Sequence, residues 1–308
     1  MKFLIIDKRK RVGKLDTEHY AVQRLGEILD DKAISYEFCH FDEIQIQCKS
    51  GRLELLLRGA PLTEFTHIIP RGHRPDEYKI KQYLAMYCSQ NNIKMQNLRF
   101  IEYMSHYNKI FQMTALTQAD LPYLDSYYCL DGQYHKKPKE VEALGFPLIY
   151  KHIEGEYRVE KIDGEDKLKK NVYLIDNVEA LEEECTSRED PEAYFVQKFA
   201  NIGEDYRAII IGGKFFAAWQ RKAPEGEFLT VTKGSEYKLY DKPSSKFLAL
   251  SDKVTSLFKA DYCAIDIIQD SGKLYVLEIN QSPGFKAFET KIEGANLDVA
   301  KAIIESMI

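Results

Sequence analysis

The stretch from Asp261 to Gly284, DYCAIDIIQDSGKLYVLEINQSPG, constrains the fold of this chain more than any other part of the sequence. It contains two apolar runs, Tyr262–Ile268 and Leu274–Ile279, on either side of an Asp-Ser-Gly turn, a pattern that predicts a β-hairpin. Each run holds an acid where an apolar residue would be expected, Asp266 in the first and Glu278 in the second. The hairpin is therefore expected to contribute functional side chains as well as residues of the hydrophobic core.

The face on which these acids lie depends on the register of the hairpin. A three-residue loop, Asp270-Ser271-Gly272, with glycine in the left-handed conformation, is a favoured connection and sets Asp266 opposite Val276. Because side chains alternate along a strand, Asp266, Glu278 and Asn280 then share one face. A two-residue loop would instead put the two acids on opposite faces.

Buried carboxylates are costly unless they are paired, hydrogen-bonded or bound to a metal. Two carboxylates and an amide oxygen on one face form an oxygen-only site, which suits Mg²⁺ bound together with nucleotide phosphates. The alternative is that both acids form salt bridges with lysines such as Lys259 or Lys286. The Asn-Gln-Ser-Pro-Gly sequence at 280–284 favours the metal site.

Composition limits the class of protein. The chain has 308 residues, 44% of them hydrophobic and 30% charged, which is typical of a globular chain with two or three modest domains. A net charge of −5 argues against a general nucleic-acid binder. No apolar run approaches the roughly 20 residues of a membrane span, and Asp7 follows Met1–Ile6 too early for a signal peptide, so we expect a cytoplasmic protein. Six scattered cysteines favour reduced thiols over a disulfide framework.

The first hundred residues predict a small α/β domain. Met1–Asp7 and Ser35–Phe41 are expected strands, and Glu18–Leu29 has helical spacing between them, so a partly parallel sheet is indicated. No G-x-G-x-x-G sequence supports dinucleotide binding. Arg71 follows a predicted strand at the end where open α/β sheets bind ligands, although a solvated loop arginine explains it equally well.

Two basic residues further along stand at strand ends. Lys151 ends the apolar strand after Gly145-Phe146-Pro147, where a lysine can act as a point charge for phosphates. Arg221 lies on the returning strand of a hairpin that turns at Gly212-Gly213, and its planar guanidinium suits bidentate binding of phosphate or carboxylate. A surface position at the strand end is the alternative for Lys151.

Together these motifs resemble a known family. Asp266 and the segment Glu278-Ile279-Asn280-Gln281-Ser282-Pro283-Gly284 look like the magnesium-binding segment of the ATP-grasp ligases, and in particular of RimK-like enzymes, which add glutamate or similar amino acids to a carboxylate. The resemblance covers nearly the whole chain. It implies an α/β ATP-grasp fold with α+β subdomains, in which an N-terminal pre-ATP-grasp domain (1–105) precedes a central lid subdomain (106–190) and a C-terminal metal-binding subdomain (191–308).

The resemblance also implies roles for individual residues. Residues expected to bind ATP are Lys109, Lys151, Lys198, Phe199, Asp205 and Arg207. Of these, Lys198 and Phe199 would flank the adenine, and Asp205 would meet the ribose. Arg221 and Lys151 are the expected catalytic residues, and Mg²⁺ or Mn²⁺ would be bound by Asp266, Glu278 and Asn280.

The function implied is that of an ATP-dependent carboxylate–amine ligase, which forms an amide through an acyl phosphate and releases ADP and phosphate. Its substrates would be a small amino-acid-like, peptide or protein carboxylate and an amine, with no membrane or nucleic-acid partner. The sequence leaves open whether the protein is a homo-oligomer.

Two segments depart from the family pattern. Glu154–Lys161 contains one glycine, Gly155, where relatives have a glycine-rich flap, and Arg158 stands where a glycine is usual. Leu229-Thr230-Val231 replaces an Arg-Ser-Asn tripeptide, with Lys233 soon after. These departures keep two alternatives open, an ATP-grasp kinase and a non-catalytic ATP-binding module.

Overall fold

The computed structural model describes residues 1–8, 20–72, 75–104, 108–155, 157–162, 165–200, 203–228, 234–290, 292, 295 and 297–308. Within these ranges the side chains of 75–76 and 157–170 are left out of the description. The predictions for Arg158, Leu229–Val231 and Lys233 fall on residues or side chains outside it. So does Asn296, which the sequence predicts as the cap of a closing helix over Leu297–Met307.

A parallel sheet forms the N-terminal part, with strand order β2-β1-β6-β7. Its strands are β1 (Lys2–Asp7), β2 (Ser35–His40), β6 (His67–Pro70) and β7 (Lys94–Met95). Helix α1 (Tyr20–Asp31) covers the face that carries Phe3 and Ile5, while α2 (Pro75–Asn91) and α3 (Leu98–Tyr103) cover the face of Leu4 and Ile6. A parallel sheet is covered on both faces, which explains why β1 is an uninterrupted apolar run.

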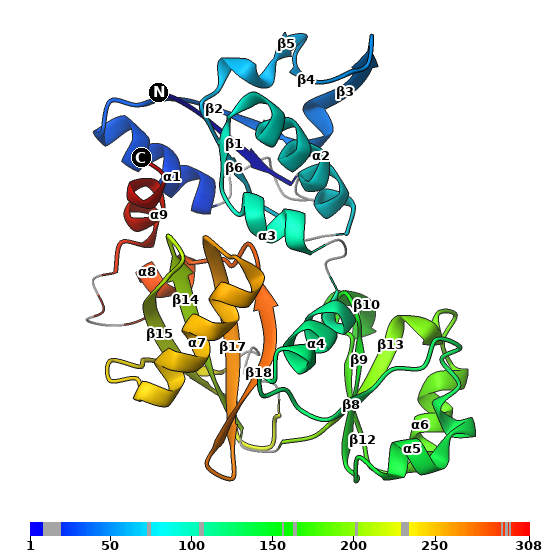
Figure 1. Ribbon diagram of the computed structural model, residues 1–308. Helices are drawn as coiled ribbons and strands as arrows, with labels where there is room; N and C mark the ends of the chain where they lie inside the picture. Colours follow the sequence, from blue (N-terminus) through cyan, green and yellow to red (C-terminus); the bar gives the residue numbers. More distant parts are fainter. Residues whose placement is uncertain are drawn as a thin grey trace.

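A separate antiparallel sheet extends from this part at the top of Figure 1. Its strands are β3 (Ile44–Lys49), β4 (Arg52–Leu57) and β5 (Ala60–Pro61). Short 3₁₀ turns elsewhere in the chain lie at Phe41–Glu43, Leu62–Glu64, Tyr134–Lys136 and Pro191–Ala193.

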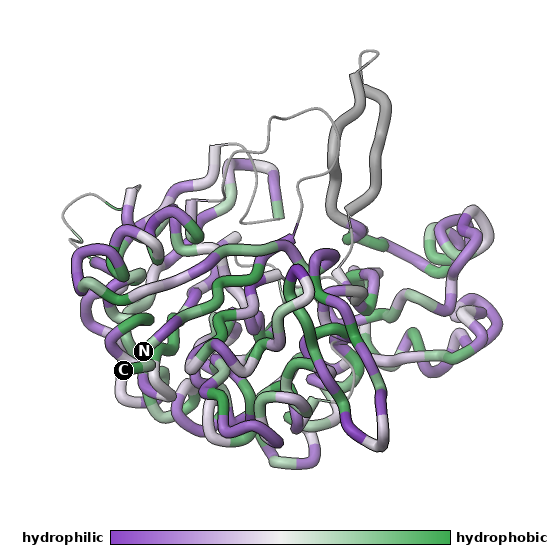
Figure 2. The backbone as a smooth tube through the Cα atoms, turned by 90° about the horizontal axis from the view of Figure 1, so that it is seen from above, coloured by the Kyte–Doolittle hydropathy of each residue, from purple (hydrophilic) through white to green (hydrophobic). Residues whose placement is uncertain are grey.

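The central lid has an antiparallel sheet of order β12-β9-β13-β8. Its strands are β8 (Ser126–Tyr127), β9 (Leu148–His152), β12 (Val172–Ile175) and β13 (Tyr194–Lys198), with helices α5 (Pro138–Glu142) and α6 (Val178–Thr186) and the hairpin β10 (Tyr157–Ile162) and β11 (Glu165–Lys170). The lid packs around its own hydrophobic cluster, which includes Tyr134, Tyr150 and Leu181. In both views the part with α5 and α6 stands apart on the right (Figures 1 and 2).

Strand β13 lies in the lid sheet, because its residues pair with β9 from Tyr194↔His152 to Lys198↔Leu148. The boundary expected between residues 190 and 191 would cut this strand from its partner. We propose that the boundary between the lid and the C-terminal part lies after Lys198.

The C-terminal part is an antiparallel sheet of order β16-β15-β14-β17-β18. Its strands are β14 (Glu204–Ile211), β15 (Lys214–Lys222), β16 (Glu236–Leu239), β17 (Tyr262–Asp270) and β18 (Lys273–Asn280). Helix α7 (Ser245–Phe258) packs on one face, and α8 (Lys286–Thr290) and α9 (Val299–Met307) pack on the other. Helix α4 (Lys109–Gln118) contacts β18 and leads into the lid.

The closing helix begins two residues later than the sequence predicts. A start at Leu297 with Asn296 as cap was expected, but the helix starts at Val299 and the side chain of Asp298 accepts a hydrogen bond from the backbone N–H of Lys301 at 2.9 Å. An aspartate in this position satisfies one of the free N–H groups of the first turn, which fixes where the helix begins.

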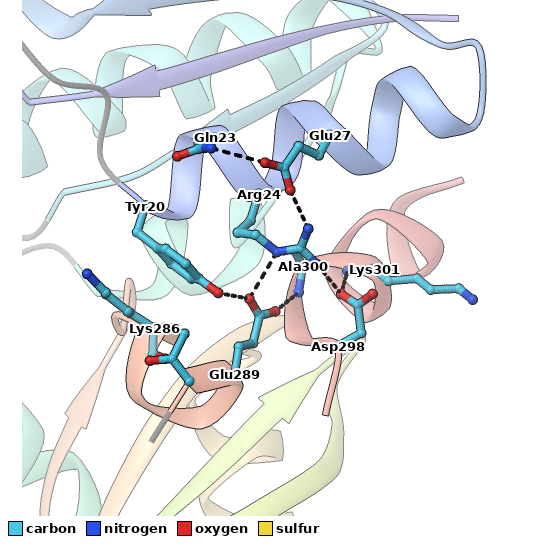
Figure 3. A network of polar contacts seen from close by, with 10 residues as sticks. Tyr20, Gln23, Arg24, Glu27, Lys286, Glu289, Asp298, Ala300 and Lys301 are labelled. Carbon is cyan, nitrogen blue, oxygen red and sulfur yellow. Dashed lines mark hydrogen bonds and ion pairs between the residues drawn. The ribbon is translucent and has the colours of Figure 1, made fainter. Parts of the chain in front are cut away.

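The N-terminal and C-terminal parts share two hydrophobic clusters, and the two chain ends lie side by side in both views (Figures 1 and 2). Figure 3 shows the polar contacts that accompany this packing. The buried carboxylate of Glu289 in α8 accepts hydrogen bonds from Tyr20 Oη (2.7 Å), Arg24 Nε (3.2 Å) and the N–H of Ala300 (3.0 Å). Burial, reinforced by Glu289, raises the pKa of Tyr20 to about 12, so its hydroxyl remains a donor.

We expect the change Glu289→Ala to lower the free energy of unfolding by roughly 1.5–3 kcal/mol, because it removes a buried acceptor that joins α1, α8 and α9. The matched control is Glu27→Ala, which removes an exposed partner of the same Arg24 and should cost less than about 1 kcal/mol. Urea unfolding monitored by circular dichroism measures both changes. Equal losses in the two variants would contradict a special role for Glu289.

Candidate active site

A cavity of about 370 Å³ lies between the lid sheet and the C-terminal sheet. It is lined by strands β9 and β13 on the lid side and by β14, β15, β17 and β18 on the other. Every residue that the sequence singles out for ATP, metal or catalysis lines it: Lys109, Lys151, Lys198, Phe199, Asp205, Arg207, Arg221, Asp266, Glu278 and Asn280. The fold thus brings together side chains that are up to 171 positions apart in the sequence numbering.

The two acids meet through a register that differs from the predicted one. The hairpin turn has two residues, Ser271 and Gly272, both with positive φ (49° and 78°), and Asp270 pairs with Lys273. Such a loop alone would put the acids on opposite faces. A shift between Asp266 and Ile267 leaves Leu277 as an extra residue on β18. This β-bulge sets Asp266 directly opposite Glu278, so the expected common face is reached by another route.

The carboxylate of Asp266 is held by two arginines. Arg207, its cross-strand neighbour on β14, donates from Nε to Oδ1 at 2.7 Å and from Nη2 to Oδ2 at 2.6 Å. Arg221 Nη2 lies 3.1 Å from Asp266 Oδ2, and it also donates to Asp205 Oδ2 at 2.8 Å. Arg221 therefore bridges two carboxylates, and Asp205, expected at the ribose, is its partner across β14 and β15.

These contacts determine the charge states at the site. Burial alone would raise the pKa of Asp266, but the charges of Arg207 and Arg221 and their hydrogen bonds hold it well below its usual range. Burial has the opposite effect on Arg221 and lowers its pKa, but Asp266 and Asp205 outweigh burial and raise it. Asp266 and Arg221 are therefore both ionised at neutral pH.

Glu278 pairs with Lys109, the first residue of α4, with Nζ 3.1 Å from Oε2. Helix α4 begins here because the side chain of Asn108 accepts a hydrogen bond from the N–H of Phe111 at 2.8 Å. The two lysines named as alternative partners lie elsewhere, since Lys259 is over the ring of Tyr103 and Lys286 over the ring of Tyr20.

Lys151 is buried at the end of β9 and contacts a residue that sequence reasoning missed. Its Nζ lies 2.7 Å from Gln197 Oε1, and Gln197 Nε2 donates to Ser126 Oγ at 2.9 Å. The contact with Gln197 holds the amine of Lys151 in the lining of the cavity. No local signal marks Gln197, because a glutamine in a strand is ordinary; only the pairing of β13 with β9 brings it to Lys151.

Apolar side chains line the cavity together with the charged ones. The rings of Phe199 and Phe228 meet edge to face at 5.9 Å, close to the end of β13. Further apolar lining residues are Leu124, Ile149, Ile268 and Leu277. The cavity thus offers both apolar and charged side chains, which is what an aromatic base carrying phosphates would need.

The oxygen donors among the lining residues fit a hard divalent cation. Asp266 and Glu278 supply carboxylate oxygens, and Asn280 Oδ1 accepts one hydrogen bond from the N–H of Ser282 at 3.0 Å and keeps a second lone pair. In the part of the chain that the structure describes, no three His, Cys, Asp or Glu side chains cluster to hold a metal. A cation here would therefore need Asn280 and ligand oxygens besides the two acids, as Mg²⁺ does when it binds with phosphates.

Arg71 lies outside the cavity lining. Its side chain is buried between the rings of Tyr262 and Phe285, and Nη2 donates to the carbonyl oxygen of Pro283 at 3.0 Å. The alternative of a solvated loop arginine is wrong, because Arg71 is 5% exposed. It holds the loop that follows β18.

None of the described helices is both long enough and apolar enough to cross a membrane.

Comparison with known proteins agrees with this geometry. The model of the RimK-like ATP-grasp domain family matches residues 106–307. The chain is 25% identical over 297 residues to N-acetylaspartylglutamate synthase A of Mus musculus, a match that covers 92% of this chain and 72% of that protein. It is 24% identical over 300 residues to the probable alpha-L-glutamate ligase of Rhodopirellula baltica, covering 94% and 68% respectively.

A solved structure shares the fold over the whole length. The ATP-grasp ligase PsnB, complexed with a phosphomimetic variant of its minimal precursor, Mg and ADP, has a TM-score of 0.68 at 15% identity, covering 99% of this chain and 97% of that one. The predicted family, fold and enzyme class are confirmed by these matches. The chain belongs to the RimK-like ATP-grasp family and is an ATP-grasp ligase whose fold binds ATP.

Proposed function

We propose that this ligase joins an amino-acid-like or peptide carboxylate to an amine. The γ-phosphoryl group of ATP passes to a carboxylate oxygen, which gives an acyl phosphate and ADP. The amine then attacks the acyl carbon, and phosphate leaves as the amide forms. The names of the two relatives, a synthase of N-acetylaspartylglutamate and a probable glutamate ligase, support amino-acid substrates.

One observation carries the proposal: cations and carboxylates line one cavity and pair with one another there, as Arg207 and Arg221 do with Asp266 and Lys109 does with Glu278. Among the described lining residues there are five lysine or arginine and five aspartate or glutamate side chains. Such a balanced set can bind polyphosphate and dications together, because the phosphates pair with the lysines and arginines and the dications pair with the carboxylates.

We propose that Asp266, Glu278 and Asn280 hold Mg²⁺ or Mn²⁺ together with the nucleotide phosphates. A dication held there would supply neutralisation of the negative charge on the phosphates. Mg accompanies ADP in the PsnB structure, which supports this choice of metal. Lys109 and Arg207, the present partners of Glu278 and Asp266, would contact phosphate oxygens.

Arg221 is the residue that we propose for the γ-phosphate. It is 2% exposed and fixed from two sides by Asp205 and Asp266, so its guanidinium is oriented before any ligand arrives. Preorganised charge of this kind stabilises a transition state more than a mobile side chain would. We propose that Asp205 orients Arg221 and lies beside the ribose.

Lys151 and Lys109 would contact the phosphates from the lid and from α4. Lys198 and Phe199 would flank the adenine. A kinase that phosphorylates a hydroxyl, or a module that only binds ATP, could use the same pocket, so product analysis decides between them.

The reaction should yield ADP and phosphate, because the proposed metal ligands and Arg221 are assigned to the β- and γ-phosphates and would stabilise the charge that develops as the γ-phosphoryl group leaves. With glutamate or N-acetylaspartate as carboxylate donor, hydroxylamine should trap the acyl phosphate as a hydroxamate, which is detected with ferric chloride or by mass spectrometry. A stable phosphoester would indicate a kinase, and ATP binding without turnover would indicate a binding module. AMP as the main product would overturn the proposal.

The variant Glu278→Gln should lower turnover by at least ~10²-fold, because it removes one charge of the metal site. Glu278 is preferable to Asp266, since its side chain is 32% exposed and the fold should tolerate the change. Glu182→Gln, on the exposed surface of α6, is the matched control and should retain wild-type turnover. Near-normal activity of Glu278→Gln at all Mg²⁺ concentrations would contradict the proposed role of Glu278 in metal binding.

Replacing Lys151 by Met removes a charge-assisted contact worth roughly 1.5–3 kcal/mol. The dissociation constant for ATP should therefore rise about 10- to 150-fold, measured by calorimetric titration. Lys139→Met, an exposed lysine of α5, serves as the control. An unchanged dissociation constant in Lys151→Met would make this lysine a structural group only.

A further inference from the structure

Strand β18 is the outer strand of its sheet, and its free edge is closed by groups from outside the sheet. The N–H of Val276 donates to the carbonyl oxygen of Pro122 at 2.9 Å. Further along, the side chain of Gln112 bonds both backbone groups of Ile279. Gln112 Nε2 donates to Ile279 O at 3.0 Å, and the N–H of Ile279 donates to Gln112 Oε1 at 2.9 Å. A single amide thus does what a neighbouring strand would do.

Ile279 stands between two residues proposed to bind the metal, Glu278 and Asn280. Its own side chain is 1% exposed and packs in the core, so the backbone groups that reach Gln112 fix the strand at this point. Gln112 is 3% exposed, and a neutral amide is the side chain that can donate and accept here without burying another charge.

We propose that Gln112 is a positioning residue that holds Glu278 and Asn280 in the geometry required for metal binding. In this role it acts through the backbone of Ile279 and not through the side chains of Glu278 and Asn280. The inference rests on the proposed metal site and extends it by naming the residue that fixes the ligand strand.

Gln112 can do this because α4 is anchored at its start. Lys109, one turn earlier on the same face, pairs with Glu278 through its side chain, and its N–H donates to Ile153 O of the lid at 2.8 Å. The first turn of α4 therefore contacts β18 twice, once through the ion pair of Lys109 with Glu278 and once through the amide of Gln112.

The chain beyond Asn280 is held in the same way. Asn97 Nδ2 donates to the carbonyl oxygen of Gln281 at 2.9 Å, and Arg71 donates to that of Pro283. Side chains from the first 112 residues thus bind the main chain of residues 279, 281 and 283 in turn. Gln112 is the member of this series that bonds the residue between the two proposed ligands.

The test compares Gln112→Met with Gln118→Met in the full-length protein. Methionine keeps the length and helix propensity of glutamine but forms no hydrogen bond with Ile279. Gln118 is the exposed last residue of α4, so the same substitution there controls for the helix. Removal of such supporting contacts typically weakens metal binding on the order of 10–100-fold. We expect a loss of that size in Mn²⁺ affinity in the presence of ADP, measured by electron paramagnetic resonance.

A second measurement needs neither metal nor activity. Hydrogen–deuterium exchange of the peptide that spans Ile279 should be faster in Gln112→Met than in the wild type and unchanged in Gln118→Met. Faster exchange with Mn²⁺ affinity within twofold of wild type would show that Gln112 is only structural and would overturn the proposal, as would unchanged exchange. If the wild-type protein binds no Mn²⁺ with ADP, the proposed metal site itself fails, and a positioning role for Gln112 toward that metal fails with it.

Discussion

The structure depends on a charged carboxylate inside a β-sheet. Asp266 is 5% exposed, and an isolated charge at such a position would be strongly destabilising. Arg207 and Arg221 compensate it with short, charge-assisted hydrogen bonds, and Arg221 in turn needs Asp205. The cluster is neutral as a whole and costly to break in part, because removing one partner leaves another charge buried. These contacts fix the relative positions of side chains from three neighbouring strands, β15, β14 and β17, in the lining of the cavity.

The sequence was informative about which residues meet and less so about how they meet. Apolar runs and turn residues predict the opening β-α-β unit, the hairpin at Gly212-Gly213 and the acid-bearing hairpin, and all of these are present. The pairing of Asp266 with Glu278 depends on a β-bulge at Leu277, and the pairing of Asp205 with Arg221 on a second shift between Ile209 and Ile210. Bulge residues of this kind are ordinary apolar residues in the sequence. Their extra step is decided by the packing of the finished sheet, so no local pattern predicts it.

Side chains that act through tertiary contact were beyond sequence reasoning for a related reason. Gln197 and Gln112 are neutral, carry no motif and lie in ordinary elements. Their importance arises from what they face: a buried ammonium group in one case and the open edge of β18 in the other. Charged residues in apolar strands attract notice because burial of charge needs an explanation. A buried amide needs only two hydrogen bonds, and those become visible only when the chain is folded.

The segment poor in glycine is explained in part by the same junction. Gly155 is the only glycine between Glu154 and Lys161, and it has φ +70°, a conformation that other residues rarely adopt. A Cβ at this position would lie 2.8 Å from Lys109 Nζ. The glycine that remains is thus the one that lets the lid approach the ammonium group paired with Glu278. The lid, α4 and β18 meet at Lys109, whose N–H donates to Ile153 O and whose ammonium group pairs with Glu278.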